Sequence, residues 1–225
     1  MPSVLQANDA GLDLVVIAGG GVYPLFGDVL VARPGSGVTK PADLKGKTVG
    51  VPGIGALLDV MLRRNLKQNG VDPKDVKFVE VGFPQAADAL RSGQIDAYPA
   101  QAPFTAQILG SGAGVAVSNW LQSTPDGTLT TVIATTRKWA TEHKDDVQKI
   151  RDAMKEAEAF EKGNDAATFA AIGKHTGLDP KIVAKIPVPN LVVDITDKQA
   201  QFWIDIAKEQ GLIKKDMKPA DVLFR

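Results

Sequence analysis

The turn that contains Gly53, Ile54 and Gly55 combines two features that suit the binding of an anion. Glycines let a backbone approach a ligand closely, and free amides at the start of a helix point towards negative charge. Residues 48–51 before the turn are predicted to form a buried strand, and an apolar stripe after it predicts a helix. Such a turn favours a carboxylate, a sulfonate or a phosphate. The alternative is a tight strand-to-helix turn without a ligand, and the spacing alone does not decide between them.

Two other segments carry groups that suit a ligand. Residues 19–23, Gly-Gly-Gly-Val-Tyr, follow a predicted strand and can bring backbone and a phenol ring to a ligand, with a flexible loop as the alternative. Residues 98–104 place aromatic, amide and proline groups at the carboxyl end of a strand, where open α/β sheets bind ligands. Ordinary loop packing is the alternative there. We expect Pro99 and Pro103 to hold Gln101 in a fixed position.

The composition excludes several classes of function. Lysine plus arginine and aspartate plus glutamate both number 26, so the formal net charge is zero and no nucleic-acid partner is expected. The chain has no cysteine, which excludes a disulfide, a thiolate metal site, an iron–sulfur cluster and a cysteine nucleophile. His143 and His175 do not fit a catalytic triad with any serine and aspartate, so both are expected at the surface. We therefore expect no enzyme activity, no metal and no cofactor.

Short β-branched runs alternate with helical periodicity, which is typical of an α/β fold with parallel strands joined by crossover helices. Strands are predicted at residues 12–18, 28–32, 48–51, 76–81, 95–98, 115–117 and 128–135. Helices are predicted after Gly55, after Pro84, at residues 104–109, 144–162 and 164–176, and after a capping box of Thr196 and Gln199. No segment has the ~20 apolar residues of a membrane helix, and the N-terminal residues do not form a signal peptide.

Three segments resemble those of a known family, the substrate-binding proteins of ABC transporters for nitrate, sulfonates, taurine and related compounds. They are residues 43–51 (DLKGKTVGV), residues 89–97 (ALRSGQIDA) and Pro103-Phe104, in this order and at these spacings. The likeness extends from about residue 12 to the C-terminus. The resemblance implies a two-lobed α/β fold like that of type II periplasmic binding proteins, in which the lobes close over a ligand in the cleft between them.

The resemblance also implies how the lobes divide. The first lobe is expected to comprise residues 1–34 and 130–225, and the second lobe, inserted into the first, residues 35–129. Hinge strands are expected at residues 28–32 and 130–135. Members of this family normally begin with an export signal and a strand–helix–strand segment that completes the first lobe, and nothing here corresponds to it. We therefore expect an N-terminally truncated chain whose incomplete first lobe exposes apolar faces and favours self-association.

Carried over by position, the ligand-facing segments of the family fall on four stretches of this chain. We expect the ligand to contact Gly21, Val22 and Tyr23 from one lobe and, from the other, Gly53, Ile54, Gly55, Ala56, Leu57, Gly82, Phe83, Gln101, Pro103 and Phe104. Helix-start amides favour an anionic group, and an apolar slot is predicted between Tyr23, Phe83, Tyr98 and Phe104. The expected ligand is a small anionic organic compound, a carboxylate or a sulfonate.

The resemblance implies a non-enzymatic periplasmic protein that delivers its ligand to an ABC permease in the inner membrane. Two alternatives stay open. One is an enzyme on the same fold, similar to the synthase of the thiamine pyrimidine precursor or to a dehydratase of menaquinone synthesis, although the cysteine-rich motif of that synthase group is missing here. The other is the effector-sensing domain of a transcription regulator, which neither a helix-turn-helix segment nor an excess of basic residues supports.

Overall fold

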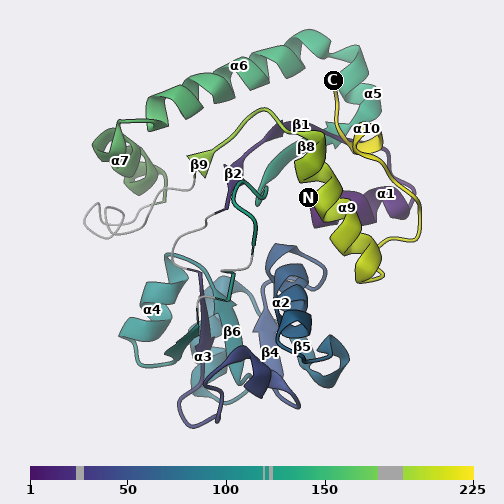
Figure 1. Ribbon diagram of the computed structural model, residues 1–225. Helices are drawn as coiled ribbons and strands as arrows, with labels where there is room; N and C mark the ends of the chain where they lie inside the picture. The colour runs from purple at the N-terminus through teal and green to yellow at the C-terminus, as the bar shows by residue number, and fades with distance from the viewer. Residues whose placement is uncertain (24–27, 119, 122–123, 177–189) are drawn as a thin grey trace. The chain divides into compact units, whose positions relative to one another are not determined.

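The computed structural model describes residues 1–23, 28–118, 120–121, 124–176 and 190–225 (Figure 1). The chain divides into two compact units. Unit 1 comprises Met1–Leu25 and Pro125–Arg225, and unit 2 comprises Phe26–Thr124. The predicted lobe boundaries, before residues 35 and 130, lie further along the chain than the boundaries of these units.

Unit 2 is built around a mixed five-stranded sheet in the order β5-β4-β6-β3-β7. Its strands are β3 (Val29–Ala32), β4 (Thr48–Val51), β5 (Lys77–Glu80), β6 (Ala97–Ala100) and β7 (Val115–Ser118). β4 is parallel to β5 and β6, whereas β3 is antiparallel to β6 and β7. The last residues of β4, β5 and β6 and the first residue of β3 therefore lie together, at what we call the carboxyl end of the sheet.

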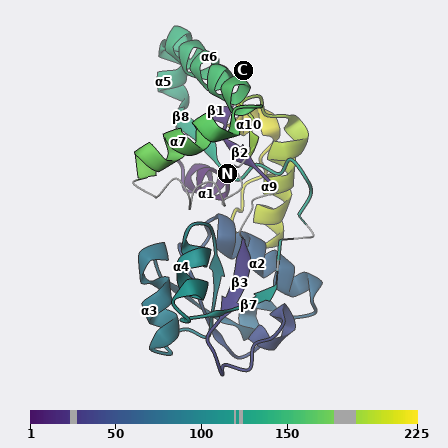
Figure 2. The same cartoon turned by 90° about the vertical axis from the view of Figure 1, so that its left-hand side faces the viewer.

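Helices lie on both faces of this sheet. α3 (Ala86–Arg91) and α4 (Phe104–Gly110) are on one side of β3, and α2 (Leu57–Gln68) is on the other (Figure 2). The α3 and α4 side holds a core cluster that includes Val31, Leu90, Ile95, Tyr98 and Ile108. α2 buries the apolar stripe that the sequence predicts, namely Leu58, Met61, Leu62 and Leu66. Short 3₁₀ turns at Pro41–Leu44, Pro73–Asp75 and Phe83–Gln85 precede β4, β5 and α3.

The described residues of unit 1 form two small antiparallel sheets. One pairs β1 (Leu14–Gly19) with β8 (Val132–Thr136), and the other pairs β2 (Gly21–Val22) with β9 (Asn190–Leu191). Its described helices are α1 (Pro2–Asp9), α5 (Arg137–Glu142), α6 (Lys144–Glu161), α7 (Asp165–Thr176), α9 (Asp197–Glu209) and α10 (Pro219–Val222). α5 and α6 pack on β1, where Val15, Ile17, Ala140 and Val147 form a core cluster.

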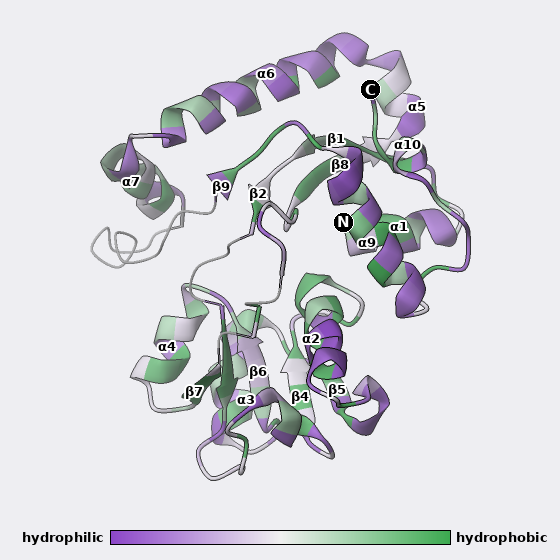
Figure 3. Cartoon of the chain, viewed as in Figure 1, coloured by the Kyte–Doolittle hydropathy of each residue, from purple (hydrophilic) through white to green (hydrophobic). Residues whose placement is uncertain are grey.

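α6 is the amphipathic helix that the sequence predicts at residues 144–162. Figure 3 shows polar residues along most of its length, interrupted by isolated apolar ones. Val147 is buried and Ile150 packs against the core cluster on β1, whereas Phe160 near the end of the helix is 52% exposed. In the part of the chain that the structure describes, no helix is both long and apolar enough to span a membrane.

The structure corrects two predictions about the elements and contains two helices that the sequence does not predict. The strands are not all parallel, because alternation of side chains carries no information about strand direction. Residues 19–23, for which a flexible loop is one interpretation, contain strand β2 instead. α1 is not predicted, because its buried side chains are limited to Pro2, Val4 and Leu5, which are too few to define a helical period. α5, with six residues, is likewise too short for a periodic signal.

Candidate functional site

The predicted ligand residues of unit 2 all lie at the carboxyl end of its sheet. Residues 53–57 follow β4, residues 82 and 83 follow β5, and residues 101–104 follow β6. Parallel strands end on the same side of a sheet, so three segments that are far apart in the sequence come together. This is the place where open α/β sheets bind their ligands.

The turn between β4 and α2 has backbone amides that are already hydrogen-bonded within the chain. The Ile54 amide donates to Oε1 of Glu80 over 2.9 Å, and the Gly55 amide donates to Oδ2 of Asp59 over 2.7 Å. Gly55 has a φ of +75°, which explains why a glycine occupies this position. These two amides therefore already have carboxylate acceptors from the chain itself, and the binding of an anionic ligand at the turn stays a prediction.

Asp59 is a buried carboxylate at this turn that is not among the predicted site residues. Its carboxylate is 1% exposed and accepts from the Gly55 amide and from Nε of Arg63, the latter over 2.7 Å. The Arg63 guanidinium also lies 3.9 Å from the centre of the Phe78 ring. The available signal is an acidic residue inside an apolar helical stripe with an arginine four positions later. This arrangement fixes the shape of the turn.

Two aromatic side chains form the apolar part of the candidate site. The rings of Phe83 and Phe104 stack with their centres 5.2 Å apart, and both are half-buried. Tyr98 meets the edge of Phe83 at 6.1 Å, but it is fully buried and its hydroxyl donates to the Val81 carbonyl. Burial raises the pKa of that hydroxyl. The prediction that Tyr98 lines a slot is therefore wrong, because the ring belongs to the core.

Gln101 and Pro103 lie between β6 and α4 and are half-buried. The peptide bond between Ala102 and Pro103 is cis. The Gln101 carbonyl accepts from the Thr105 amide over 3.0 Å, so the backbone of this segment is tied to the first turn of α4. The prediction that Gln101 sits in a defined loop therefore agrees with the hydrogen bonding.

Asp28 is a second residue that the sequence analysis did not select as a site residue. It precedes β3 and lies at the carboxyl end of the sheet, where it is 3% exposed. Burial raises the pKa of its carboxyl to about 7, and the neighbouring side-chain amide of Gln101 opposes this shift. Neither carboxyl oxygen has a hydrogen-bond partner of normal geometry among the described residues. The signal in the sequence is a lone acidic residue at the start of an apolar run.

The remaining predicted ligand residues, Gly21, Val22 and Tyr23, belong to unit 1. Gly21 and Val22 form β2, in which Val22 is buried. The Gly21 amide donates to the Thr131 hydroxyl, and the Gly21 carbonyl accepts from the Thr130 hydroxyl. Tyr23 is half-buried, and its amide donates to the Thr128 carbonyl. Backbone groups in this segment are therefore used by the fold, and a ligand-binding role for it stays a prediction.

The three tryptophans have different surroundings. Trp203 is buried and donates from Nε1 to the Leu129 carbonyl over 2.8 Å, so it belongs to the core. Trp120 is also buried, at 2% exposed. Trp139 stacks on His143 with the ring centres 4.7 Å apart, and His143 is exposed. Among the described residues, no three histidine, aspartate or glutamate side chains are grouped to hold a metal ion.

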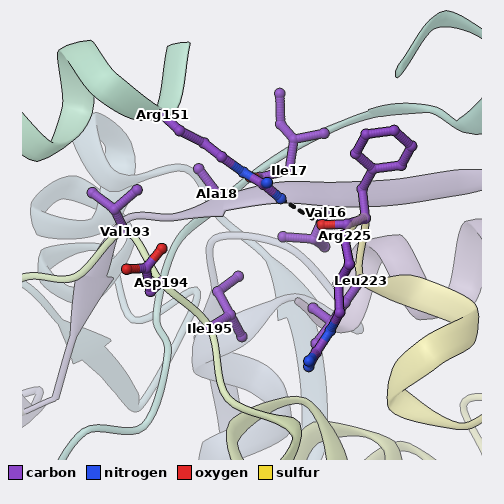
Figure 4. A pocket seen from close by; sticks show the side chains of 10 residues that line it. Val16, Ile17, Ala18, Arg151, Val193, Asp194, Ile195, Leu223 and Arg225 are labelled. Atoms are coloured by element: carbon purple, nitrogen blue, oxygen red, sulfur yellow. Dashed lines mark hydrogen bonds between the residues drawn. The ribbon is translucent and has the colours of Figure 1, made fainter. Parts of the chain in front are cut away.

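A pocket of about 220 Å³ lies in unit 1, and none of the residues that line it is a predicted site residue (Figure 4). It is lined by Val16, Ile17, Ala18, Arg151, Val193, Asp194, Ile195, Leu223, Phe224 and Arg225. The Arg151 guanidinium donates to the carbonyls of Ile17 and Phe224, so it ties β1 and α6 to the C-terminal residues. Asp194 pairs with Lys155, and Arg225 pairs with Asp197. The charged groups of the pocket therefore already have partners within the protein, and these contacts stabilise the fold.

Several proteins of known structure share this fold. The alkanesulfonate-binding protein SsuA from Xanthomonas axonopodis pv. citri, solved bound to MOPS, has a TM-score of 0.78 and 22% identity over 100% of this chain and 78% of its own. The ligand-binding component of an ABC-type import system from Staphylococcus aureus, solved with zinc bound, has a TM-score of 0.78 and 16% identity over 99% of this chain and 76% of its own. The predicted fold class, that of the type II periplasmic binding proteins, is thereby confirmed.

Enzymes also use this fold. The desulfurization enzyme DSZB has a TM-score of 0.63 and 16% identity over 95% of this chain and 78% of its own. None of the curated proteins matches the chain. A family model described as NMT1/THI5 like matches residues 1–164.

Proposed function

Because the chain belongs to the NMT1/THI5-like family, we propose that it is the solute-binding component of an ABC uptake transporter and acts in the periplasm. Its ligand is a small organic anion, a carboxylate or a sulfonate, which it captures without chemical change and passes to a permease. The fold shared with an alkanesulfonate-binding protein and with an ABC import component supports this function.

The observation that carries the proposal is the convergence of three segments at the carboxyl end of the unit 2 sheet. They contribute a glycine turn, a stacked pair of phenylalanines and a half-buried amide side chain. Small-molecule sites are mostly apolar with a few well-placed polar groups, and this end of the sheet has that composition. The histidines, by contrast, belong to unit 1, where His143 lies between α5 and α6, His175 lies in α7, and both are exposed.

The two parts of the ligand have different places in this arrangement. The organic body packs against the half-buried rings of Phe83 and Phe104. The Ile54 and Gly55 amides already meet carboxylates, so they are not vacant donors. The first-turn amides of α2 at Leu57 and Leu58 have no acceptor within the helix, and Ala56 provides no capping side chain. These amides are therefore available as two of the donors to the anionic group.

The experiment is a thermal-shift panel of alkanesulfonates, taurine, nitrate, aliphatic and aromatic carboxylates and thiamine precursors. A compound that binds only the folded state raises the melting temperature by mass action. The proposal expects a concentration-dependent rise with one class of organic anion, and unchanged compound when the mixture is analysed afterwards. A rise with sugars or cations alone, or no rise with any compound, contradicts it.

A pair of matched variants locates the site. Phe104→Ala removes one of the stacked rings and is expected to weaken the binding of the active compound about tenfold or more. Phe160→Ala removes an exposed phenylalanine of α6 in unit 1 and is expected to leave binding unchanged. Equal effects of the two substitutions would contradict a site at the carboxyl end of the unit 2 sheet.

A second candidate is an enzyme on this fold, which the likeness to DSZB favours. The two functions differ in the fate of the ligand. Consumption of a panel compound by the purified protein supports the enzyme, and recovery of the intact compound supports the binding protein.

A further inference from the structure

The buried carboxyl of Asp28 is not explained by the fold. A buried polar group without a partner costs about 1–3 kcal/mol, and native proteins usually satisfy it with water, an ion or a ligand. Asp28 is 3% exposed, and neither of its oxygens has a hydrogen-bond partner of normal geometry among the described residues, although the Gln101 amide is near enough to lower the pKa of the carboxyl. The carboxyl does not begin a helix and does not form one of the ion pairs found in the described part of the chain.

The strand register places Asp28 beside the candidate site. β3 and β6 are antiparallel, with Val29 opposite Ala100. The next pair towards the carboxyl end of the sheet is therefore Asp28 and Gln101, and Gln101 is the polar neighbour that acts on the Asp28 carboxyl. Two side chains with hydrogen-bonding capacity thus project from adjacent strands, next to the segment that carries Phe104.

The charged groups around β3 do not favour an ionised Asp28. β6, β7 and α4 make the main described contacts with β3, and within these three elements the titratable side chain is Tyr98 on β6, whose hydroxyl donates to the Val81 carbonyl. Arg33 follows the far end of β3 and pairs with Asp96 over 2.7 Å. At the carboxyl end of the sheet, the Arg63 guanidinium pairs with Asp59, and the Glu80 carboxylate accepts from the Ile54 amide, so neither group supplies a positive charge for Asp28. A proton on Asp28 is therefore the available compensation.

We propose that Asp28 binds the ligand in its protonated form, donating a hydrogen bond to the anionic group together with the Gln101 amide, so that binding takes up one proton. This inference rests on the proposed function and deepens it, since it makes Asp28 a specificity residue for anions. A protonated carboxyl and an amide both donate, whereas an ionised carboxyl would repel the same ligand. Burial already brings the pKa of Asp28 to about 7 in the free protein.

The sign of the pH dependence follows from the proton uptake. Below about pH 7 the carboxyl is protonated and affinity for an anion is constant; above it, affinity falls by about tenfold for each pH unit. Asp28→Asn keeps an N–H donor but cannot ionise, so it is expected to bind with the low-pH affinity of the wild type at every pH. Asp28→Ala lacks the donor and is expected to bind weakly at every pH.

The test is isothermal titration with butane-1-sulfonate and with benzoate, between about pH 5.5 and about pH 8.5, a range in which both probes stay ionised. The wild type, Asp28→Asn, Asp28→Ala and the control Asp88→Asn are compared. Asp88 is an exposed residue of α3 that pairs with Arg91, so its variant is expected to behave like the wild type. Titrations in two buffers of different ionisation enthalpy measure the proton uptake of the wild type directly and do not depend on any variant folding.

Each outcome has one meaning. Binding that weakens above pH 7 in the wild type and stays level in Asp28→Asn, with close to one proton taken up at about pH 8, supports the inference. Binding that is independent of pH, or that strengthens as the pH rises, overturns it while leaving the proposed function intact. No binding of either probe, nor of any other anion of the panel, at any pH overturns both.

Discussion

The backbone amide of Ile54 donates a 2.9 Å hydrogen bond to the side chain of Glu80. The carboxylate at the end of β5 therefore lies on the turn that follows the neighbouring strand β4. Glu80 is an exposed residue at the end of β5. Its carboxylate occupies a donor of the kind that the anionic group of a ligand would use, and two anions at one turn repel each other. Glu80 and the ligand are therefore expected to compete.

Glu80→Ala should raise the affinity for butane-1-sulfonate by about two- to tenfold, the range expected for one released hydrogen-bond donor. Glu80→Gln should have a smaller effect, because its amide oxygen still accepts. Titration calorimetry gives the affinities, with Asp88→Ala as the control for the loss of one negative charge from unit 2. A loss of affinity in Glu80→Ala would show that the carboxylate supports the site instead of competing for it.

Asp59→Ala should destabilise the protein by about 3 kcal/mol, because it leaves a buried amide and a largely buried guanidinium without their acceptor. Urea unfolding followed by circular dichroism measures the loss. The matched control is Asp88→Ala, whose ion pair with Arg91 is exposed and should contribute less than about 1 kcal/mol. Similar losses in the two variants would mean that the Asp59 contacts are no stronger than surface ones.

Gly19→Ala should destabilise unit 1 by about 2–4 kcal/mol, because a Cβ at this position would lie 2.2 Å from the backbone carbonyl oxygen of Val192. Backbone atoms cannot move aside as a flexible side chain does. Gly110→Ala at the end of α4 is the control, since a Cβ there meets no atom within 4 Å. Thermal unfolding should show a large decrease in Tm for the first variant and a change close to zero for the second.

Asp28 should make the stability of the protein depend on pH even without a ligand. Burial raises the pKa of its carboxyl from 3.8 to about 7, so between these values the native state binds more protons than the unfolded chain. The free energy of unfolding contributed by this group therefore falls as the pH rises from about 4 to about 7, by on the order of 1–4 kcal/mol, and is constant above.

Asp28→Asn removes this dependence. The variant is expected to be more stable than the wild type at about pH 8 and to differ less from it at about pH 5, as measured by urea unfolding at the two pH values. A variant that is less stable than the wild type at about pH 8 would show that the ionised carboxylate has a favourable partner in the native protein.

The sequence predicts an element well when the residues that mark its ends lie within or next to it in the chain. β4 has the predicted bounds, because its apolar run is closed by Lys47 on one side and Pro52 on the other. The capping box at the start of α9 is confirmed, with the Gln199 amide donating to the Thr196 hydroxyl and the Thr196 amide donating to the Gln199 side chain. In both cases the residues that define the element are close together in the sequence.

The details that the sequence does not predict depend on partners that are distant in the chain. The direction of β3 is set by its neighbours β6 and β7, and nothing within its four residues encodes it. The role of Asp59 depends on the Gly55 amide being turned towards it. Tyr98 is of a residue type that often lines ligand sites, yet its hydroxyl donates to the Val81 carbonyl inside the core. Position in the sheet, and not residue type, decides these cases.

The pairing of Leu30 in β3 with Ser118 in β7 joins the first and last strands of unit 2. This unit is one uninterrupted stretch of sequence, and its two ends therefore leave the sheet side by side. Segments with adjacent ends can be inserted into a host chain without stretching it. Unit 2 thus has the geometry of an exchangeable cassette, and grafting it between related proteins would transfer the residues at the carboxyl end of its sheet as a set.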